Sequence, residues 1–186
     1  AVNDAPIIST EVFVQYDSLA TNPFGVTRES TNIFSPEFVD IDNDGDLDFF
    51  VKARYQPNGF FENIGTASIP QFKEVTWDPF NLNNLGSGLG SFNFVDFDKD
   101  GDFDAFSGHG DQIHYYENIG TADNPDFATA VIDPFGIGRY GSYSDPNFVD
   151  IDNDGDLDAF IGDRYAGVRF VENIGTIDNP DFTTAI

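Results

Sequence analysis

Three short acidic segments hold the residues of this chain that are best suited to chemistry. Each has Asp at its first, third, fifth, seventh and ninth positions and Gly at its sixth, as in DIDNDGDLD, DFDKDGDFD and DIDNDGDLD. Alternate carboxylates on a curling loop converge on one point, and Ca²⁺ takes about six to eight oxygen ligands. The pattern therefore predicts one calcium ion per segment. The candidate ligands are Asp40, Asp42, Asp44, Asp46, Asp48, Asp96, Asp98, Asp100, Asp102, Asp104, Asp150, Asp152, Asp154, Asp156 and Asp158.

Each position of the acidic segment has an expected role. Gly at position six permits a sharp turn, and the apolar residue at position eight (Leu47, Phe103 or Leu157) is expected to anchor the loop in a sheet. We expect position seven to give its backbone carbonyl and position nine to complete the ligand shell. An EF-hand is excluded, because it needs Glu at position twelve and flanking helices, whereas position twelve is Val, Ser or Ile. Mg²⁺ is disfavoured because it retains its waters. The alternative is a solvated acidic turn without metal.

The charge of the chain is concentrated in these segments. The sequence has 33 acidic and 8 basic side chains, for a formal charge of −25, and 15 of the acids lie in the three segments. Five carboxylates within nine residues repel one another, so metal binding and folding should be coupled. The scarcity of Lys and Arg excludes a nucleic-acid binder and disfavours an anionic membrane surface.

Other chemical constellations are weak. With no Cys, the chain has neither disulfides nor a thiolate nucleophile. His109 and His114 are not spaced as a metal pair, and we expect His114 to lie on a strand surface. No Ser-His-Asp grouping, phosphate loop or dinucleotide fingerprint can be assembled. We therefore expect no enzyme.

The acidic segments belong to an internal repeat. They begin at residues 40, 96 and 150, and the markers ENIGT, Pro-Phe and Pro-x-Phe recur in the same register, about every 55 residues. The repeats span 20–76, 77–131 and 132–186, after a lead-in at 1–19. The chain begins with Ala, and we expect a mature, trimmed or excerpted piece.

The apolar residues predict an all-β fold. They come in short runs rich in Phe, Val, Ile and Tyr between Gly, Asp, Asn and Pro, without a helical stripe or a run of transmembrane length. Four short antiparallel strands per repeat suit a β-propeller blade, with Phe filling the wedge between blades. The expected strands are 36–41, 47–52, 59–63 and 71–76, then 91–97, 103–107, 112–118 and 126–132, then 146–151, 157–162, 167–173 and 181–186.

At this level the residues resemble a known family. FVDIDNDGDLD followed by FENIGT is similar to the FG-GAP/VCBS repeat of integrin-α-like seven-bladed propellers and many bacterial extracellular proteins. The resemblance implies that the calcium loop joins the first and second strands of each blade, and that the fifteen Asp residues above are its ligands. AVNDAPI at the N-terminus resembles the end of a bacterial cadherin-like or Ig-like repeat, with an irregular terminus as the alternative.

This chain departs from the family in having three blades. We therefore expect part of a larger propeller, or a homo-oligomer whose copies close the ring. Two copies would give six blades.

The connections at the other end of the blades differ between repeats, as recognition loops do on a constant scaffold. The residues of this expected ligand face are Arg54, Tyr55, His109, Arg139, Tyr140, Tyr143, Arg164 and Tyr165. For any single one of them, an ordinary loop residue is the alternative. The sequence thus predicts a secreted or cell-surface, calcium-binding propeller module for adhesion or for recognition of carbohydrate or protein. The alternatives are a structural spacer and an accessory domain of a larger secreted enzyme.

Overall fold

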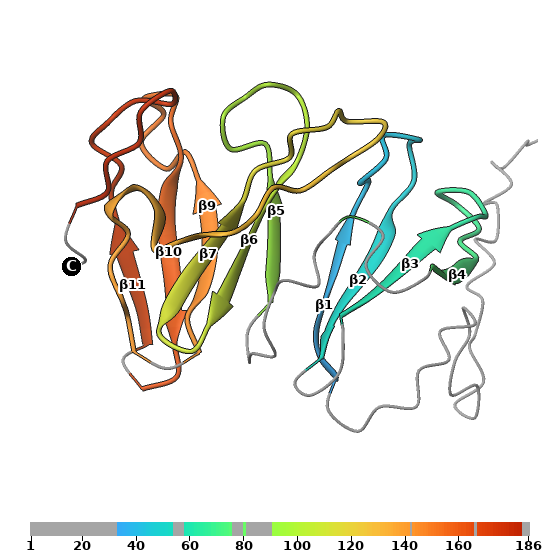
Figure 1. Cartoon of the computed structure of the whole chain (residues 1–186), viewed down its shortest axis with the longest axis horizontal. Helices are drawn as coiled ribbons and strands as arrows, with labels where there is room; N and C mark the ends of the chain where they lie inside the picture. The colour runs from blue at the N-terminus through green and yellow to red at the C-terminus, as the bar shows by residue number, and fades with distance from the viewer. Residues whose placement is uncertain are drawn as a thin grey trace, which may run out of the picture.

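The computed structural model describes residues 33–53, 58–75, 80, 91–141, 143–165 and 167–183. These residues form three antiparallel sheets that stand side by side in chain order (Figure 1). The expectation of an all-β chain is confirmed. Among the described residues, no helix is long and apolar enough to cross a membrane.

The three sheets share one topology, in which each strand pairs with the next along the chain. The first sheet contains β1 (Ile33–Val39), β2 (Asp48–Ala53), β3 (Gly59–Asn63) and β4 (Phe72–Val75). The second contains β5 (Phe92–Val95), β6 (Asp104–His109), β7 (Gln112–Tyr116) and β8 (Val131–Ile132). The third contains β9 (Asp145–Val149), β10 (Asp158–Asp163) and β11 (Gly167–Val171).

The predicted fourth strand is shorter than expected in the second repeat. Of 126–132, only Val131 and Ile132 form β8, while Phe127 makes an isolated bridge to Asn118. In the third repeat Phe182 makes the same bridge to Asn173, and 184–186 lie outside the described residues. Pro70 stands at the same place before β4 of the first sheet, so the proline of this marker does not by itself shorten the strand.

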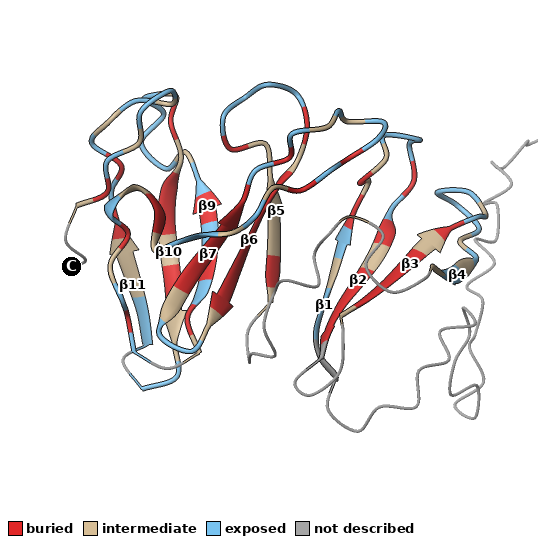
Figure 2. Cartoon of the chain, in the orientation of Figure 1, coloured by how far each residue is buried: buried red, intermediate tan, exposed pale blue. Residues whose placement is uncertain are grey.

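The core fills the two spaces between neighbouring sheets. Phe50 of β2 packs against Phe94 of β5 with ring centroids 4.6 Å apart, and Phe106 of β6 packs against Phe148 of β9 at 4.1 Å. The middle sheet is therefore buried on both faces, as the colouring of β6 and β7 shows (Figure 2). β5 contacts both β1 and β9, so the first strands of successive sheets lie next to one another.

The recurring Pro-Phe marker supplies a wedge between sheets. The ring of Phe80 lies 5.0 Å from Phe60 of the first sheet and 6.3 Å from Phe127 of the second repeat. Phe135 repeats this role, because it stacks on Phe97 at 5.3 Å while its carbonyl accepts a hydrogen bond from the Phe182 amide. The third copy, Pro23-Phe24, lies outside the described residues.

Candidate metal centres

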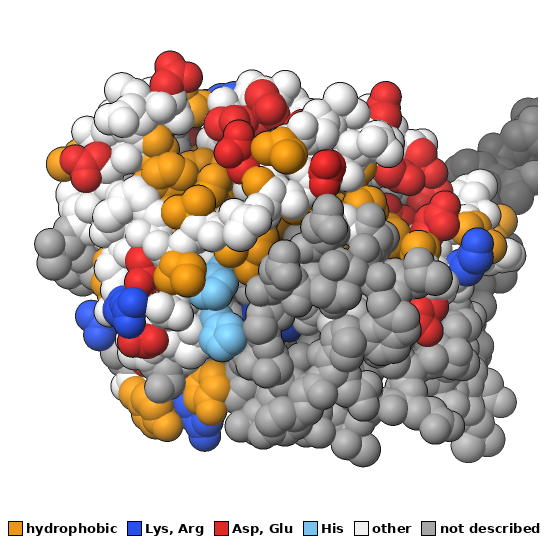
Figure 3. Space-filling view, in the orientation of Figure 1, with side chains coloured by type: hydrophobic (Ala, Val, Ile, Leu, Met, Phe, Trp, Pro, Cys, Tyr) orange, Lys and Arg blue, Asp and Glu red, His pale blue; other side chains and the backbone are white. Residues whose placement is uncertain are grey.

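Each acidic segment connects the first two strands of its sheet. The three loops join β1 to β2, β5 to β6 and β9 to β10, at one common end of the molecule (Figure 1). Acidic side chains gather along this end, the upper edge of the space-filling view (Figure 3). The glycine at position six has a left-handed φ in every loop, +93° to +102°, with open space where a Cβ would stand. The turn therefore depends on backbone freedom, as the sequence predicted.

The first, third and fifth carboxylates of each loop converge. In each triplet the ligand oxygens all lie within 4.8 Å of one another. The triplets are Asp40, Asp42 and Asp44; Asp96, Asp98 and Asp100; and Asp150, Asp152 and Asp154. Hydrogen bonds within the loop maintain this curl, since the amide of each seventh residue donates to the carboxylate of the fifth at 3.1 Å.

Buried carboxylate oxygens without a hydrogen-bond donor mark the centre of each loop. One oxygen of the first and one of the seventh carboxylate are in this state in all three loops. They belong to Asp40, Asp46, Asp96, Asp102, Asp150 and Asp156. A buried acceptor without a donor is costly unless a cation satisfies it. The residues present therefore fit a bound metal ion.

The side chain at position seven of each loop has a larger role than the sequence led us to expect. The side chains of Asp46, Asp102 and Asp156 are buried, whereas the sequence pointed chiefly to their backbone carbonyls. Their carboxylates are therefore candidate ligands alongside the first, third and fifth, although positions seven and nine lie outside the converging triplets.

Position nine fastens the loop to the neighbouring hairpin. One oxygen of Asp48 accepts the backbone N–H of Asn63 at 2.8 Å, and Asp104 and Asp158 make the same bond to Asn118 and Asn173. The other oxygen of Asp104 accepts the Tyr115 hydroxyl at 3.1 Å. That of Asp48 is buried without a partner. Position nine thus has a structural role in every loop, with an oxygen left for metal in the first.

The Asn of ENIGT is a functional residue that the sequence reasoning missed. The side-chain oxygen of Asn118 accepts the amides of Gly120 and Asp126, at 3.0 and 2.9 Å. Asn63 and Asn173 do the same in their own repeats. One buried amide therefore holds the turn that follows the third strand while its backbone holds the metal loop. This Asn recurs at the same position of all three repeats, and that recurrence was the sequence signal that could have identified it.

The electrostatics of the loops favour protonation when no cation is present. Burial raises the pKa of Asp48 and of Asp104 to about 7, because it penalises the charged form. Burial and the adjacent charge of Asp44 raise the pKa of Asp46. Burial and the charge of Asp100 likewise raise the pKa of Asp102. A bound cation would favour the ionised forms of these groups.

The predicted ligand face is partly dispersed. Arg54 and Tyr55 lie outside the described residues. Tyr140 is buried in the core between the second and third sheets, where its hydroxyl accepts the Gly138 amide at 3.2 Å. Arg139 is exposed and pairs with Asp133 at 2.9 Å.

Three residues of this face do come together. The guanidinium of Arg164 lies over the Tyr143 ring at 5.1 Å and over the Tyr165 ring at 5.6 Å. Arg164 and Tyr165 are in the β10–β11 connection, while Tyr143 precedes β9, so two of the variable connections meet here. The result is a cation–aromatic cluster, with Arg164 and Tyr165 exposed and Tyr143 half-buried, at the end of the sheets away from the acidic loops.

The two histidines are neighbours, contrary to the expectation for His114. Their rings stack with centroids 5.4 Å apart, on the face visible in Figure 3. His114 is buried rather than on a strand surface, because His109 and Tyr116 flank it on its own sheet. Burial lowers the pKa of both imidazoles, with the nearby Lys52 charge contributing.

The chain matches no protein-family model, and no curated protein is significantly similar to it in sequence.

Proposed function

We propose that the chain is a calcium-stabilised β-propeller module of the FG-GAP/VCBS type. It acts outside the cell, in adhesion or in the recognition of a carbohydrate or protein ligand. The observation that carries this proposal is the threefold recurrence of one acidic loop, with three converging carboxylates and buried oxygens that lack donors.

The donor set selects the kind of cation. Every candidate ligand is a carboxylate or a backbone carbonyl, and hard oxygen donors suit Ca²⁺ rather than the metals that prefer imidazole or thiolate. Asp42, Asp44 and Asp46 would hold the ion in the first loop, together with Asp40. Bound there, the ion would neutralise the local repulsion and fix the connection between β1 and β2.

The packing of the sheets supports a propeller. Successive sheets have the same topology, and equivalent rings fill both spaces between them, Phe50 with Phe94 and Phe106 with Phe148. Such repetition, with each unit contacting only its neighbours, is the arrangement of propeller blades.

A binding role is favoured over a catalytic one. Lys52 donates a hydrogen bond to Ser107, a pairing that activates a serine nucleophile in some hydrolases. Both side chains are almost fully buried, however, so a substrate has no access to them. The exposed Arg164 and Tyr165 and the half-buried Tyr143 instead offer rings and hydrogen-bond donors, which suit sugars and polar protein surfaces.

The metal proposal is tested by calorimetric titration of the chelated protein with Ca²⁺. We expect one site per loop, and a higher melting temperature in Ca²⁺ than in EDTA. The variant Asp98→Asn should lose one site, whereas Asp111→Asn, an exposed carboxylate in the β6–β7 turn at the opposite end of the sheet, should lose none. If EDTA changes neither the melting temperature nor protease resistance, the proposal is wrong.

The binding proposal is tested on a glycan array and in a cell-adhesion assay. We expect the double variant Tyr143→Ala/Tyr165→Ala to lose signal while keeping its calcium sites. A silent array, with adhesion unaffected by the double variant, would instead support a structural spacer. The burial of Tyr140 and the ion pair of Arg139 are the observations that favour this second candidate.

A further inference from the structure

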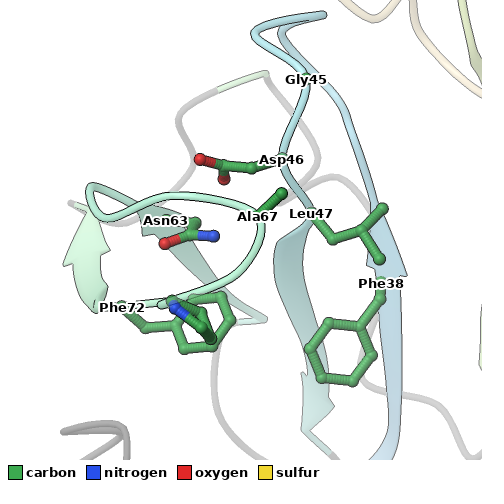
Figure 4. Close-up of a pocket in the computed structure, with 8 residues that line it drawn as sticks. Phe38, Gly45, Asp46, Leu47, Asn63, Ala67 and Phe72 are labelled. Carbon is green, nitrogen blue, oxygen red and sulfur yellow. The ribbon is translucent and has the colours of Figure 1, made fainter. Parts of the chain in front are cut away.

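The two outermost sheets of the described chain each have one apolar face without a neighbouring sheet. On the first sheet this is the leading face, formed by Phe38, Leu47, Phe49 and Phe72. The rings of Phe38, Phe49 and Phe72 lie 5.1 to 6.3 Å apart. Phe38, Leu47 and Phe72, with Ala67 and Pro70, line a cavity of about 340 Å³ beside the acidic loop (Figure 4). On the third sheet it is the trailing face, formed by Val149, Ile151, Phe160 and Phe170, with the last two rings 5.2 Å apart.

The internal repeat shows what these faces do elsewhere in the same chain. Phe38 occupies the repeat position of Phe94 and Phe148, and Phe160 occupies that of Phe50 and Phe106. In both internal interfaces these positions meet, as Phe50 with Phe94 at 4.6 Å and Phe106 with Phe148 at 4.1 Å. Phe160 and Phe38 are thus the two halves of a third such pair, one at each end of the described chain.

The exposure of the remaining positions follows the same rule. Ile41 and Phe97 are 2% and 4% exposed between sheets, but their counterpart Ile151 on the trailing face is 56% exposed. Phe103 and Leu157 pack against the core clusters of the preceding interface, but their counterpart Leu47 on the leading face is 54% exposed. Side chains that are core in two sheets are therefore at the surface in the third because no other described sheet covers them.

A polar contact accompanies the apolar one in both interfaces, although its partner differs between them. Position four of each acidic loop reaches the next repeat, since Asn43 donates to Asp123 at 2.9 Å and Lys99 donates to the carbonyl of Gly155. At the trailing face this position is Asn153, which is exposed. Ser68, also exposed, stands in the first repeat where Asp123 stands in the second. Asn153 and Ser68 thus occupy the repeat positions of Asn43 and Asp123, the pair that bonds between the first and second repeats.

We propose that the leading face binds the trailing face of a second copy of this chain, head to tail, with Phe160 of one copy against Phe38 of the other. The contact is heterologous, so each copy has one face of each kind, and two copies satisfy both faces if the ring closes. Contiguous exposed apolar surface of this kind marks an interaction site. The inference stands on the repeat and does not require the metal or ligand proposals.

The test is the mass of the protein in Ca²⁺-containing buffer, measured by analytical ultracentrifugation. We expect the wild type to form a species of twice the chain mass. Phe38→Asp and Phe160→Asp should each be monomeric, because every head-to-tail contact needs one intact face of each kind. An equimolar mixture of the two variants should recover the dimer mass, because one leading and one trailing face remain intact.

A control and a covalent readout complete the experiment. Ile119→Asp should leave the dimer intact, because Ile119 and its counterparts Ile64 and Ile174 are exposed in every repeat and so belong to no interface. The chain has no Cys, so a mixture of Phe38→Cys and Phe160→Cys should cross-link on mild oxidation, whereas either alone should not. A wild type that stays monomeric at about 200 µM, well above the dissociation constant of a specific dimer, overturns the proposal. So does a mixture that fails to associate or to cross-link.

Discussion

Lys52 lies buried between the first and second sheets. Its ammonium donates to Ser107 and, at 2.7 Å, to the carbonyl of Gly108, and it lies over the Phe92 ring at 5.5 Å. The other repeats have Gly at this position, and a Cβ on Gly108 would collide with the carbonyl of Ser144, so the second interface leaves no room for a side chain there. Burial lowers the pKa of Lys52 from 10.5 to about 8, with Asp145 opposing the shift.

This lowered pKa predicts a stability that increases with pH. Below pH 8 both folded and unfolded states hold the proton, and the cost of burying the charge is present in full. Between about pH 8, the pKa of Lys52 in the folded state, and pH 10.5, its pKa in the unfolded state, only the folded state releases the proton. The free energy of unfolding of the wild type should then rise by about 2 to 3 kcal/mol from pH 7 to 10, relative to Lys52→Met.

Denaturant titrations of both proteins across this range provide the measurement. Taking the difference between them cancels the titration of Tyr115 and other shared groups. Lys73→Met, at an exposed position of β4, should follow the wild type. Parallel curves for the wild type and Lys52→Met would contradict the prediction.

At the scale of the element, the turn after the third strand depends on a close backbone approach. A Cβ on Gly120 would lie 2.4 Å from the carbonyl oxygen of Asn124 and 2.7 Å from the amide of Asp126. Gly65 and Gly175 are equally crowded in their own repeats. The Gly of ENIGT is therefore fixed by space, whereas the Gly of the acidic loop is fixed by its left-handed φ.

Alanine substitutions separate these two causes. Gly110→Ala, at φ +65° with nothing within 4 Å, should cost about 1 kcal/mol of stability through left-handed strain. Gly120→Ala should cost at least about 2 kcal/mol, because the backbone must shift and the Asn118 hydrogen bonds with it. Thermal and urea unfolding measure both. Equal costs would show that crowding does not govern the ENIGT turn.

The strands and connections show which features of the structure could be predicted from the sequence. Short Phe-rich runs and the register of the markers predict the positions of the eleven strands that the described residues form, because burial and turn chemistry are local. The convergence of Asp96, Asp98 and Asp100 is likewise local. The network around Asn118 is not, since it joins residues on separate connections. The same holds for Tyr140, which the sequence places in a variable loop and the packing of two sheets buries.

At the scale of the whole molecule, the charge of −25 destabilises the folded state by an amount that depends on whether the acidic loops bind cations. Without cations, the carboxylates of the loops repel one another and the rest of the acidic chain. Screening over about 10 Å at 0.1 M salt reduces this cost. The melting temperature in EDTA should therefore rise when NaCl is increased from about 20 to 500 mM.

The calcium-loaded protein provides the comparison. Its melting temperature should respond less to the same increase in NaCl, because the loop charges are already compensated. Calorimetric scans of the two forms at each salt concentration measure the difference. An equal response in both forms would mean that the loops do not dominate the electrostatic cost of folding.

The wedges formed by Phe80 and by Phe135 have a consequence for how such a chain can gain repeats in evolution. Each wedge comes from the segment that leads into a sheet, and it seals that sheet against the one before it. A tandem duplication of one repeat therefore brings its own seal, its own loop and both of its faces. Lengthening by whole repeats disturbs no existing contact except at the point of insertion. Gain or loss of a fraction of a repeat would leave a sheet without its seal.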